Sequence, residues 1–270
     1  MSKPLQQPPD DLHDRLEACY RLYNRRRYVH PDPLEFLYSY QRPEDREIAG
    51  LIAASLAYGR VGQILKSVSV VLSRMGPSPR AYLEGCGPER LRRDMEGFVH
   101  RFAGEHQMAA LLWAVREVLL GYGSLEQCFR MHLEECGNSM HPALCRFSAD
   151  LRRAGQWGGP GHLVACPEKG SACKRIHLFL RWMVRKDRVD PGGWEGVSPA
   201  LLIVPLDTHM FRMCKSLGLT VRRQADMKAA AEITGAFRQF SPRDPVKYDF
   251  VLTRFGIRKD LSGSEAQIFA

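Results

Sequence analysis

The stretch from Ile203 to Arg212 reads IVPLDTHMFR and joins an apolar run to a polar helix start. The apolar run ends at Asp207, and the residues after it predict a helix that closes at Gly218, a favourable residue just past a helix C-terminus. An aspartate at this position caps the helix, because its carboxylate accepts a hydrogen bond from the free N–H groups of the first turn. A cap alone does not account for an aspartate that lies beside His209 and Arg212 in the sequence. We therefore interpret the stretch as part of a functional site.

A second informative stretch lies upstream, where Gly170–Arg175 reads GSACKR and opens a predicted helix over Cys173–Lys186. Small residues let the backbone approach a ligand closely, and the N–H groups of a helix start suit a phosphate. At about 100° per residue, Lys174, Arg181 and Arg185 share the side opposite the apolar residues. This basic face is either a solvated surface or a contact for a polyanion.

Together the two stretches resemble the helix-hairpin-helix DNA glycosylases, the superfamily of endonuclease III, the adenine glycosylases and the 8-oxoguanine glycosylases. In that superfamily a glycine-rich hairpin precedes a helix that carries a lysine in the bifunctional members, and an aspartate follows in a V-D-T-H-like motif. Leu206-Asp207-Thr208-His209 is similar to that motif, and Lys174 falls where the nucleophilic lysine is expected. The whole chain resembles an uncharacterised bacterial subfamily, and the specific likeness covers about residues 163–215.

The chain departs from the superfamily pattern in three ways. The hairpin is reduced to Pro167–Ala172, with alanine where the last glycine is expected. Lys174 and Asp207 lie 33 residues apart, a long gap that is similar to the archaeal 8-oxoguanine glycosylases and arises from the segment 187–199, whose role the sequence leaves open. Only Cys214 follows Cys173, so the four-cysteine iron–sulfur cluster of endonuclease III is not expected.

The resemblance implies a bifunctional DNA glycosylase and AP lyase of base excision repair. Lys174 would attack C1′ of the sugar, expel a damaged base and form a Schiff base, with Asp207 activating the lysine. We expect 8-oxoguanine as the first substrate to test. The residues expected to contact DNA are Gly170, Ser171, Ala172, Arg175, Arg181, His209 and Arg212. The residues expected to line the base pocket are Trp194, Tyr248, Asp249 and Phe250.

Composition and charge agree with a globular protein that meets a polyanion. The chain has 270 residues and a net charge of +9, and 30 of its 39 basic side chains are arginine. Residues 1–135 carry 18 basic and 18 acidic side chains, whereas residues 136–270 carry 21 and 12. The excess therefore lies in the half that holds both informative stretches. The apolar content of 44% excludes wholesale disorder.

The periodicity predicts an all-α protein. The resemblance implies the two-lobed helix-hairpin-helix glycosylase fold, in which residues 1–45 and 200–270 form one helical lobe and residues 46–199 the barrel lobe. Besides those already named, helices are expected over Leu12–Arg27, 43–58, Val61–Arg74, Met108–Leu120, Leu125–Glu135 and Pro142–Arg153, with a final helix after Pro245. Glycine-rich Gly155–Gly170 breaks the pattern between helices.

The remaining features predict a cytoplasmic protein, and the resemblance implies a monomer that acts on damaged double-stranded DNA without a cofactor. No apolar run is long enough for a bilayer, and the start shows no signal peptide. Eight scattered cysteines favour reduced thiols. Cys128, His132 and Cys136 share a helical stripe, and His141 and Cys145 repeat the spacing. This set is either a zinc site or core, and core packing is favoured since no C-x-x-C pair occurs, so no metal is predicted.

Two other interpretations stay open at this point. One is a non-catalytic nucleic-acid-binding protein of the same fold, in which Lys174 only contacts phosphate. The other is a structural or interaction protein whose helices merely resemble the fold. Borohydride trapping on damaged duplexes separates the enzyme from both of these alternatives.

Overall fold

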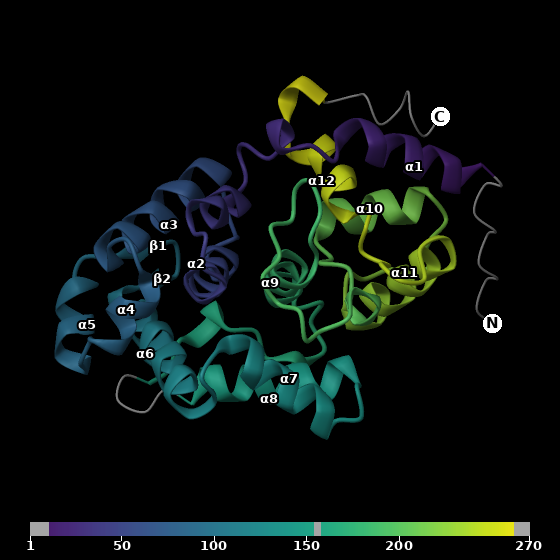
Figure 1. The fold of residues 1–270 in the computed structure, drawn as a ribbon. Helices are drawn as coiled ribbons and strands as arrows, with labels where there is room; N and C mark the ends of the chain where they lie inside the picture. Colours follow the sequence, from purple (N-terminus) through teal and green to yellow (C-terminus); the bar gives the residue numbers. More distant parts are fainter. Residues whose placement is uncertain (1–10, 154–157, 262–270) are drawn as a thin grey trace.

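The chain folds into helices almost throughout, which confirms the all-α prediction (Figure 1). The computed structural model describes residues 11–153 and 158–261, so residues 155–157 of the predicted glycine-rich segment lie outside it.

The helices up to residue 135, with 3₁₀-helices marked η, are α1 (Leu12–Tyr23), η1 (Arg26–Tyr28), η2 (Pro33–Ser39), α2 (Pro43–Ser55), α3 (Val61–Met75), α4 (Pro79–Glu84), α5 (Pro88–Asp94), α6 (Glu105–Tyr122) and α7 (Leu125–Glu135). Those that follow are α8 (Met140–Arg152), η3 (Gly161–Leu163), η4 (Pro167–Lys169), α9 (Lys174–Val184), η5 (Pro199–Leu201), α10 (Thr208–Ser216), α11 (Met227–Phe240), α12 (Asp249–Ile257) and η6 (Lys259–Leu261).

The helix starts follow from local sequence. Proline occupies the first turn of α2, α4 and α5, where its missing N–H costs nothing. Ser78, Ser124, Asp207 and Asp226 cap α4, α7, α10 and α11, each accepting a hydrogen bond from a backbone N–H of the first turn. The predicted helices are present. α7 has the predicted ends, the others have one or both ends shifted, and α4, α5 and α11 are additional to them.

The helices form two groups on either side of α9 (Figure 1). In one group α3–α6 gather beside α2, and α7 packs against α8 below them. In the other, α1, α10, α11 and α12 lie together, with α12 contacting both α1 and α10. The apolar core is continuous from Leu12 to Leu261 and crosses between the groups, and η2 contacts α2 and α3. The predicted boundaries of the two lobes therefore stay a prediction.

Helix α9 is enclosed on both sides, and this burial corrects the predicted basic face. Arg181 and Arg185 are each only 3% exposed at the side chain, although they lie opposite the apolar residues of α9. Both guanidinium groups pair with the fully buried Asp190, and Arg181 also pairs with Asp249 of α12. Burial works to lower the pKa of Arg181, but Asp190 and Asp249 outweigh it and keep the pKa above its ordinary value. The interpretation of Arg181 as a DNA contact is wrong, because its charge is used inside the protein.

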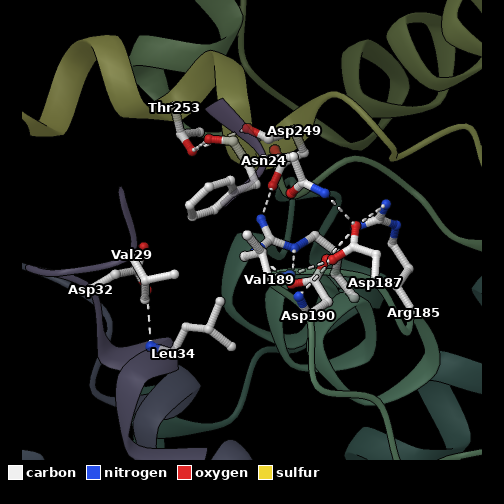
Figure 2. A network of polar contacts seen from close by, with 12 residues as sticks. Asn24, Val29, Asp32, Leu34, Arg185, Asp187, Val189, Asp190, Asp249 and Thr253 are labelled. Carbon is white, nitrogen blue, oxygen red and sulfur yellow. Dashed lines mark hydrogen bonds and ion pairs between the residues drawn. The ribbon is translucent and has the colours of Figure 1, made fainter. Parts of the chain in front are cut away.

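The same network joins α1 and the segment after α9 to the core (Figure 2). Asp187 accepts hydrogen bonds from Asn24 at the end of α1 and from Arg185, and Arg185 also pairs with Asp244. Removing one partner of a buried ion pair leaves an uncompensated charge and costs roughly 3–5 kcal/mol. The network therefore fixes the second group of helices against α9.

The segment 187–199 folds back over α9 instead of extending into solvent. Trp194 is 3% exposed, packs against Phe129 and Phe179, and donates its indole N–H to Glu47 at 2.9 Å. Burial is the main cause that raises the pKa of Glu47 to about 7. Trp194 is thus a core residue, and its assignment to a base pocket is wrong.

Two general properties complete the description. Across residues 11–153 and 158–261, no single helix is both long and apolar enough to cross a membrane, and α6 with α7 meets the length and composition test only as a pair bent by 67°. The eight cysteines all lie in these residues and are free thiols.

Candidate active site

The two residues that the sequence singles out lie in contact. Lys174 is the first residue of α9 and Asp207 is the N-cap of α10, so two helix starts meet here. Lys174 Nζ is 2.8 Å from Asp207 Oδ2, and the side chains are 34% and 30% exposed. Asp207 Oδ1 accepts the backbone N–H of Met210 at 2.8 Å, so the cap orients the carboxylate toward the amine.

The charge state of the pair follows from its surroundings. Burial works to raise the pKa of Asp207, but the Lys174 ammonium and the N–H of Met210 outweigh it, and the pKa lies below its ordinary value. Asp207 is therefore ionised at neutral pH and forms a true ion pair with the lysine. A reaction that uses the amine must first remove its proton, and Asp207 is the carboxylate in direct contact with it.

Lys174 and Asp207 line a cleft of about 280 Å³ between the two groups of helices. This volume is at the small end of the range for ligand pockets. One wall comes from the segment between α2 and α3 and from the start of α3, and the other from α10 and α12. The lining is mostly apolar and includes Pro31, Pro33, Ala57, Tyr58, Gly59, Val61, Ile64, Leu178, His209, Thr253, Gly256 and Ile257.

His209 lies in the cleft wall, and its ring packs on the backbone of α12. Its predicted contact with DNA stays a prediction. A Cβ at Gly256 would come within 2.6 Å of the His209 ring, so only glycine leaves room for it there. The buried Nε2 of His209 has no hydrogen-bond partner among the described residues. The histidine therefore retains an unused polar atom beside the Lys174–Asp207 pair.

The segment between α1 and α2 is held at the cleft by a third buried arginine. Arg254 of α12 pairs with Asp32 at 2.6 Å and donates to the backbone carbonyl of Val29 at 3.2 Å. Asp32 also accepts the N–H of Leu34, the bond drawn in Figure 2. These contacts position Pro31 and Pro33 in the cleft wall.

The predicted hairpin is partly occupied by contacts within the protein. Gly170 adopts a left-handed conformation with φ of 75°, and its carbonyl accepts the N–H of Met227 at 3.1 Å. Ser171 forms an isolated β-bridge with Asp226, and Ala172 is buried. Gly170 and Ser171 are exposed and border the start of α9, so their predicted contact with DNA stays a prediction, whereas the buried Ala172 side chain offers no contact surface.

The two remaining predicted arginines differ. Arg175 donates to the backbone carbonyls of Ser55 (2.6 Å) and His162, and its guanidinium lies over the Tyr58 ring. It holds the start of α9 against the end of α2 and against η3, which corrects its assignment as a contact for DNA phosphate. Arg212 is exposed on α10, one turn beyond His209, and stays available to a ligand.

The residues that were predicted to line the base pocket at the start of α12 do not line the cleft. Tyr248, Asp249 and Phe250 are at most 2% exposed, and Asp249 pairs with Arg181. Thr253 and Ile257 face the cleft instead. The sequence thus predicts the correct helix, but the apolar pattern alone does not show which side lines a cavity.

The rim of the cleft holds residues that the sequence did not predict. A short hairpin of β1 (Val99–His100) and β2 (Ala103–Gly104) carries the exposed Arg101 and Phe102 at its turn, and Phe102 is 76% exposed. The Arg101 side chain lies against Gly59, which lines the cleft, and the Phe102 ring is 6.4 Å from that of His162. In the sequence, the turn is marked locally by an arginine followed by a phenylalanine, and the structure adds that this phenylalanine is exposed.

A family model described as "Protein of unknown function (DUF2400)" matches residues 32–258. The chain belongs to the DUF2400 family. The match extends from Asp32 to Arg258, so in this DUF2400 protein it takes in Lys174, Asp207 and all of the cleft lining except Pro31, but leaves out α1. No curated protein and no solved structure matches the DUF2400 chain.

Proposed function

We propose that this protein is a DNA glycosylase with AP-lyase activity, built on the two-lobed helix-hairpin-helix fold. It acts as a cytoplasmic monomer on damaged double-stranded DNA and uses no cofactor. An oxidised purine, 8-oxoguanine first, is the proposed substrate. The observation that carries the proposal is the contact between Lys174 and Asp207 in the lining of an apolar cleft.

The chemistry needs a nucleophile and a group that takes its proton. Asp207, 2.8 Å from Lys174 Nζ, accepts the ammonium proton and leaves a neutral amine. The amine attacks C1′, the N-glycosidic bond breaks, and its electron pair leaves with the base, which takes up a proton. The nitrogen then loses a proton as the sugar ring opens to a Schiff base, and β-elimination cuts the strand.

The cleft suits an extruded base because its walls are largely apolar. Tyr58 offers an aromatic face, and the prolines of residues 31–33 and Leu178 offer flat or apolar surface. A base removed from the stack needs such a surface to replace the stacking that it loses. His209 and Thr253 supply polar atoms that can distinguish one base edge from another.

The surroundings of the cleft favour a polyanion. Arg101 and Phe102 at the rim combine a positive charge with an aromatic side chain. Proteins that bind single-stranded or unstacked nucleic acid use this pair of features. Arg212 is exposed on α10, beyond the cleft residue His209. The first N–H groups of α9 lack partners within the helix and lie next to Lys174, where a phosphate binds favourably.

A non-catalytic nucleic-acid-binding protein is the alternative that one observation favours. Asp207 is ionised in the resting state and holds Lys174 as an ammonium, which is also the form that contacts a phosphate. A purely structural role is the remaining alternative and requires no affinity for DNA.

Base release from a panel of duplexes tests the proposal. Each duplex carries one lesion, including 8-oxoguanine, an oxidised pyrimidine, uracil or an abasic site, and an undamaged duplex serves as control. The enzyme is expected to release the free base and to nick the strand for at least one lesion. Salt-dependent binding without release on any lesion supports the non-catalytic alternative, and no binding at low salt excludes every nucleic-acid function.

A further inference from the structure

A cluster of three potential metal ligands lies between α7 and α8, apart from the Lys174 cleft. Cys128 and His132 occupy successive turns of α7, and Asp150 comes from the facing helix α8. The Cys128 Sγ, a His132 ring nitrogen and an Asp150 oxygen all lie within 4.8 Å of one another. The three side chains are almost fully enclosed.

We propose that Cys128, His132 and Asp150 bind a zinc ion that braces α7 against α8. This reverses the prediction from sequence, which favoured core packing for the stripe and expected no metal. The other three residues of the sequence pattern lie outside this cluster. Cys136 caps the end of α7, and His141 and Cys145 form a separate exposed pair on α8, with 3.8 Å between Cys145 Sγ and His141 Nε2. The missing signal was Asp150, which only the packing of α7 on α8 brings to the stripe.

The separations of the donor atoms fit a tetrahedral zinc ion. Bond lengths of about 2.3 Å for sulfur and about 2.0–2.2 Å for nitrogen and oxygen place S and O about 3.6 Å apart, and N and O about 3.3 Å apart. Cys128 Sγ is 3.7 Å from Asp150 Oδ2, which matches already. His132 Nε2 is 2.7 Å from the same oxygen, so it must move away by about 0.6 Å when a metal replaces the shared proton.

The donor set selects zinc over the hard cations. A thiolate and an imidazole are ligands of zinc and similar transition ions, whereas calcium and magnesium take oxygen ligands. Three protein donors leave the fourth position to a water molecule. The thiol loses its proton on binding, and that proton goes to solvent.

The surrounding groups supply the second layer of contacts that a zinc site requires. Tyr122 donates to Asp150 Oδ2 at 2.9 Å, and Arg153 pairs with Oδ1 at 3.1 Å. The buried Nδ1 of His132 has no hydrogen-bond partner among the described residues, and Glu135 Oε2 lies 3.8 Å away. Once Nε2 binds the metal, Nδ1 carries the proton, and a small shift of Glu135 lets it accept that hydrogen bond.

Without a metal, hydrogen bonds to Asp150 hold the cluster together. Burial, followed by the charge of Asp150, raises the pKa of the Cys128 thiol. Burial also works to raise the pKa of Asp150, but His132 and Tyr122 outweigh it, so the carboxylate is ionised. Zinc must therefore displace the thiol proton when it binds.

Metal titration of the full chain tests the site. Purified protein, stripped by a chelator, is titrated with Co²⁺ as a spectroscopic substitute and with Zn²⁺, followed by elemental analysis after dialysis. One metal per chain is expected, with a thiolate-to-cobalt charge-transfer band and a rise in the thermal unfolding midpoint on adding zinc. Cys128→Ser should abolish the band, and Asp150→Asn, which preserves the contact with Tyr122, should weaken zinc binding at least tenfold.

The exposed pair on α8 provides the matched control. His141→Asn with Cys145→Ser should leave the stoichiometry, the band and the stabilisation unchanged. The proposal is overturned if the chain binds no metal, if the α8 double variant rather than Cys128→Ser removes the band, or if the Asp150→Asn protein folds and binds zinc as tightly as the wild type. The last two results assign the metal to another site, and the first leaves a hydrogen-bonded Tyr122–Asp150–His132 network.

Discussion

Asp207 Oδ2 lies 2.8 Å from Lys174 Nζ although the residues are 33 positions apart in the chain. The other carboxylate oxygen is bonded to the N–H of Met210. Because α10 begins at this carboxylate, the start of the helix holds the oxygen that faces the amine. Helix capping and the candidate chemistry therefore use the same side chain.

Replacing the aspartate with its amide separates these two roles. Asp207→Asn keeps an acceptor for Met210 but removes the charge and the proton acceptor beside Lys174. We expect the rate of base excision to fall by roughly 10²–10⁴, the range for a lost acid–base group. Stability should change by only about 0–1 kcal/mol, because the ion pair is partly exposed. Single-turnover kinetics and thermal unfolding measure the two effects.

The N-cap of α11 supplies the control. Asp226 caps that helix through Ala229 in the same way, and it does not line the cleft. Asp226→Asn should leave the excision rate at the wild-type value. Equal losses of rate in the two variants, or an unchanged rate in Asp207→Asn, would show that the charge of Asp207 takes no part in the reaction.

The hairpin turn at the rim leads to a prediction about binding. Phe102 is 76% exposed, so Phe102→Ala should leave the unfolding midpoint unchanged. Stacking of a base on an aromatic side chain is worth about 1–3 kcal/mol. The Kd for a lesion-containing duplex should therefore rise by roughly five- to 150-fold, as measured by fluorescence anisotropy.

An exposed leucine elsewhere controls for a general loss of apolar surface. Leu120 of α6 is 62% exposed and does not line the cleft. Leu120→Ala should bind the duplex as the wild type does. A Phe102→Ala protein with unchanged Kd would remove the turn from the DNA-binding surface.

A buried histidine of α9 makes stability depend on pH. Neither ring nitrogen of His177 has a hydrogen-bond partner among the described residues, and burial, with a smaller effect of His141, lowers its pKa to about 4. Below pH 6.5 the unfolded chain binds a proton that the folded protein does not. The free energy of unfolding therefore falls as the pH drops from about 6.5 to about 4, by roughly 3 kcal/mol from this group.

His177→Leu removes this contribution and keeps the site apolar. As the pH falls from about 6.5 to about 4, the free energy of unfolding of the wild type should fall relative to that of the variant. Urea denaturation at a series of pH values measures it. A difference that stays constant from pH 7.5 to pH 4 would mean that His177 is protonated equally in both states.

Local signals in the sequence predict the helices and the central pair of residues. Proline and acids at the start of α2, and Asp207 before α10, act through contacts within one turn, so the sequence alone specifies them. Lys174 and Asp207 follow from short motifs at two helix starts. The structure adds that these two starts meet.

The errors concern residues whose surroundings come from distant parts of the chain. Periodicity places Arg181 opposite the apolar side of α9, but only the fold shows that Asp190 and Asp249 cover that side. The cluster of Asp150 with Cys128 and His132 is not an error of the same kind, but it too forms only through the packing of α8 on α7. Helical periodicity describes one helix at a time and carries no information about which helices enclose it.

Covalent trapping tests the central claim most directly. Sodium borohydride reduces a Schiff base to a stable amine, so wild-type protein incubated with a duplex containing 8-oxoguanine or an abasic site should form a protein–DNA adduct whose peptide maps to Lys174. Lys174→Gln should form none, whereas Lys169→Gln, at an exposed lysine just before the same helix, should form as much as the wild type. An adduct that persists in Lys174→Gln, or no adduct from the wild type with any lesion, would contradict the assignment of Lys174 as the nucleophile.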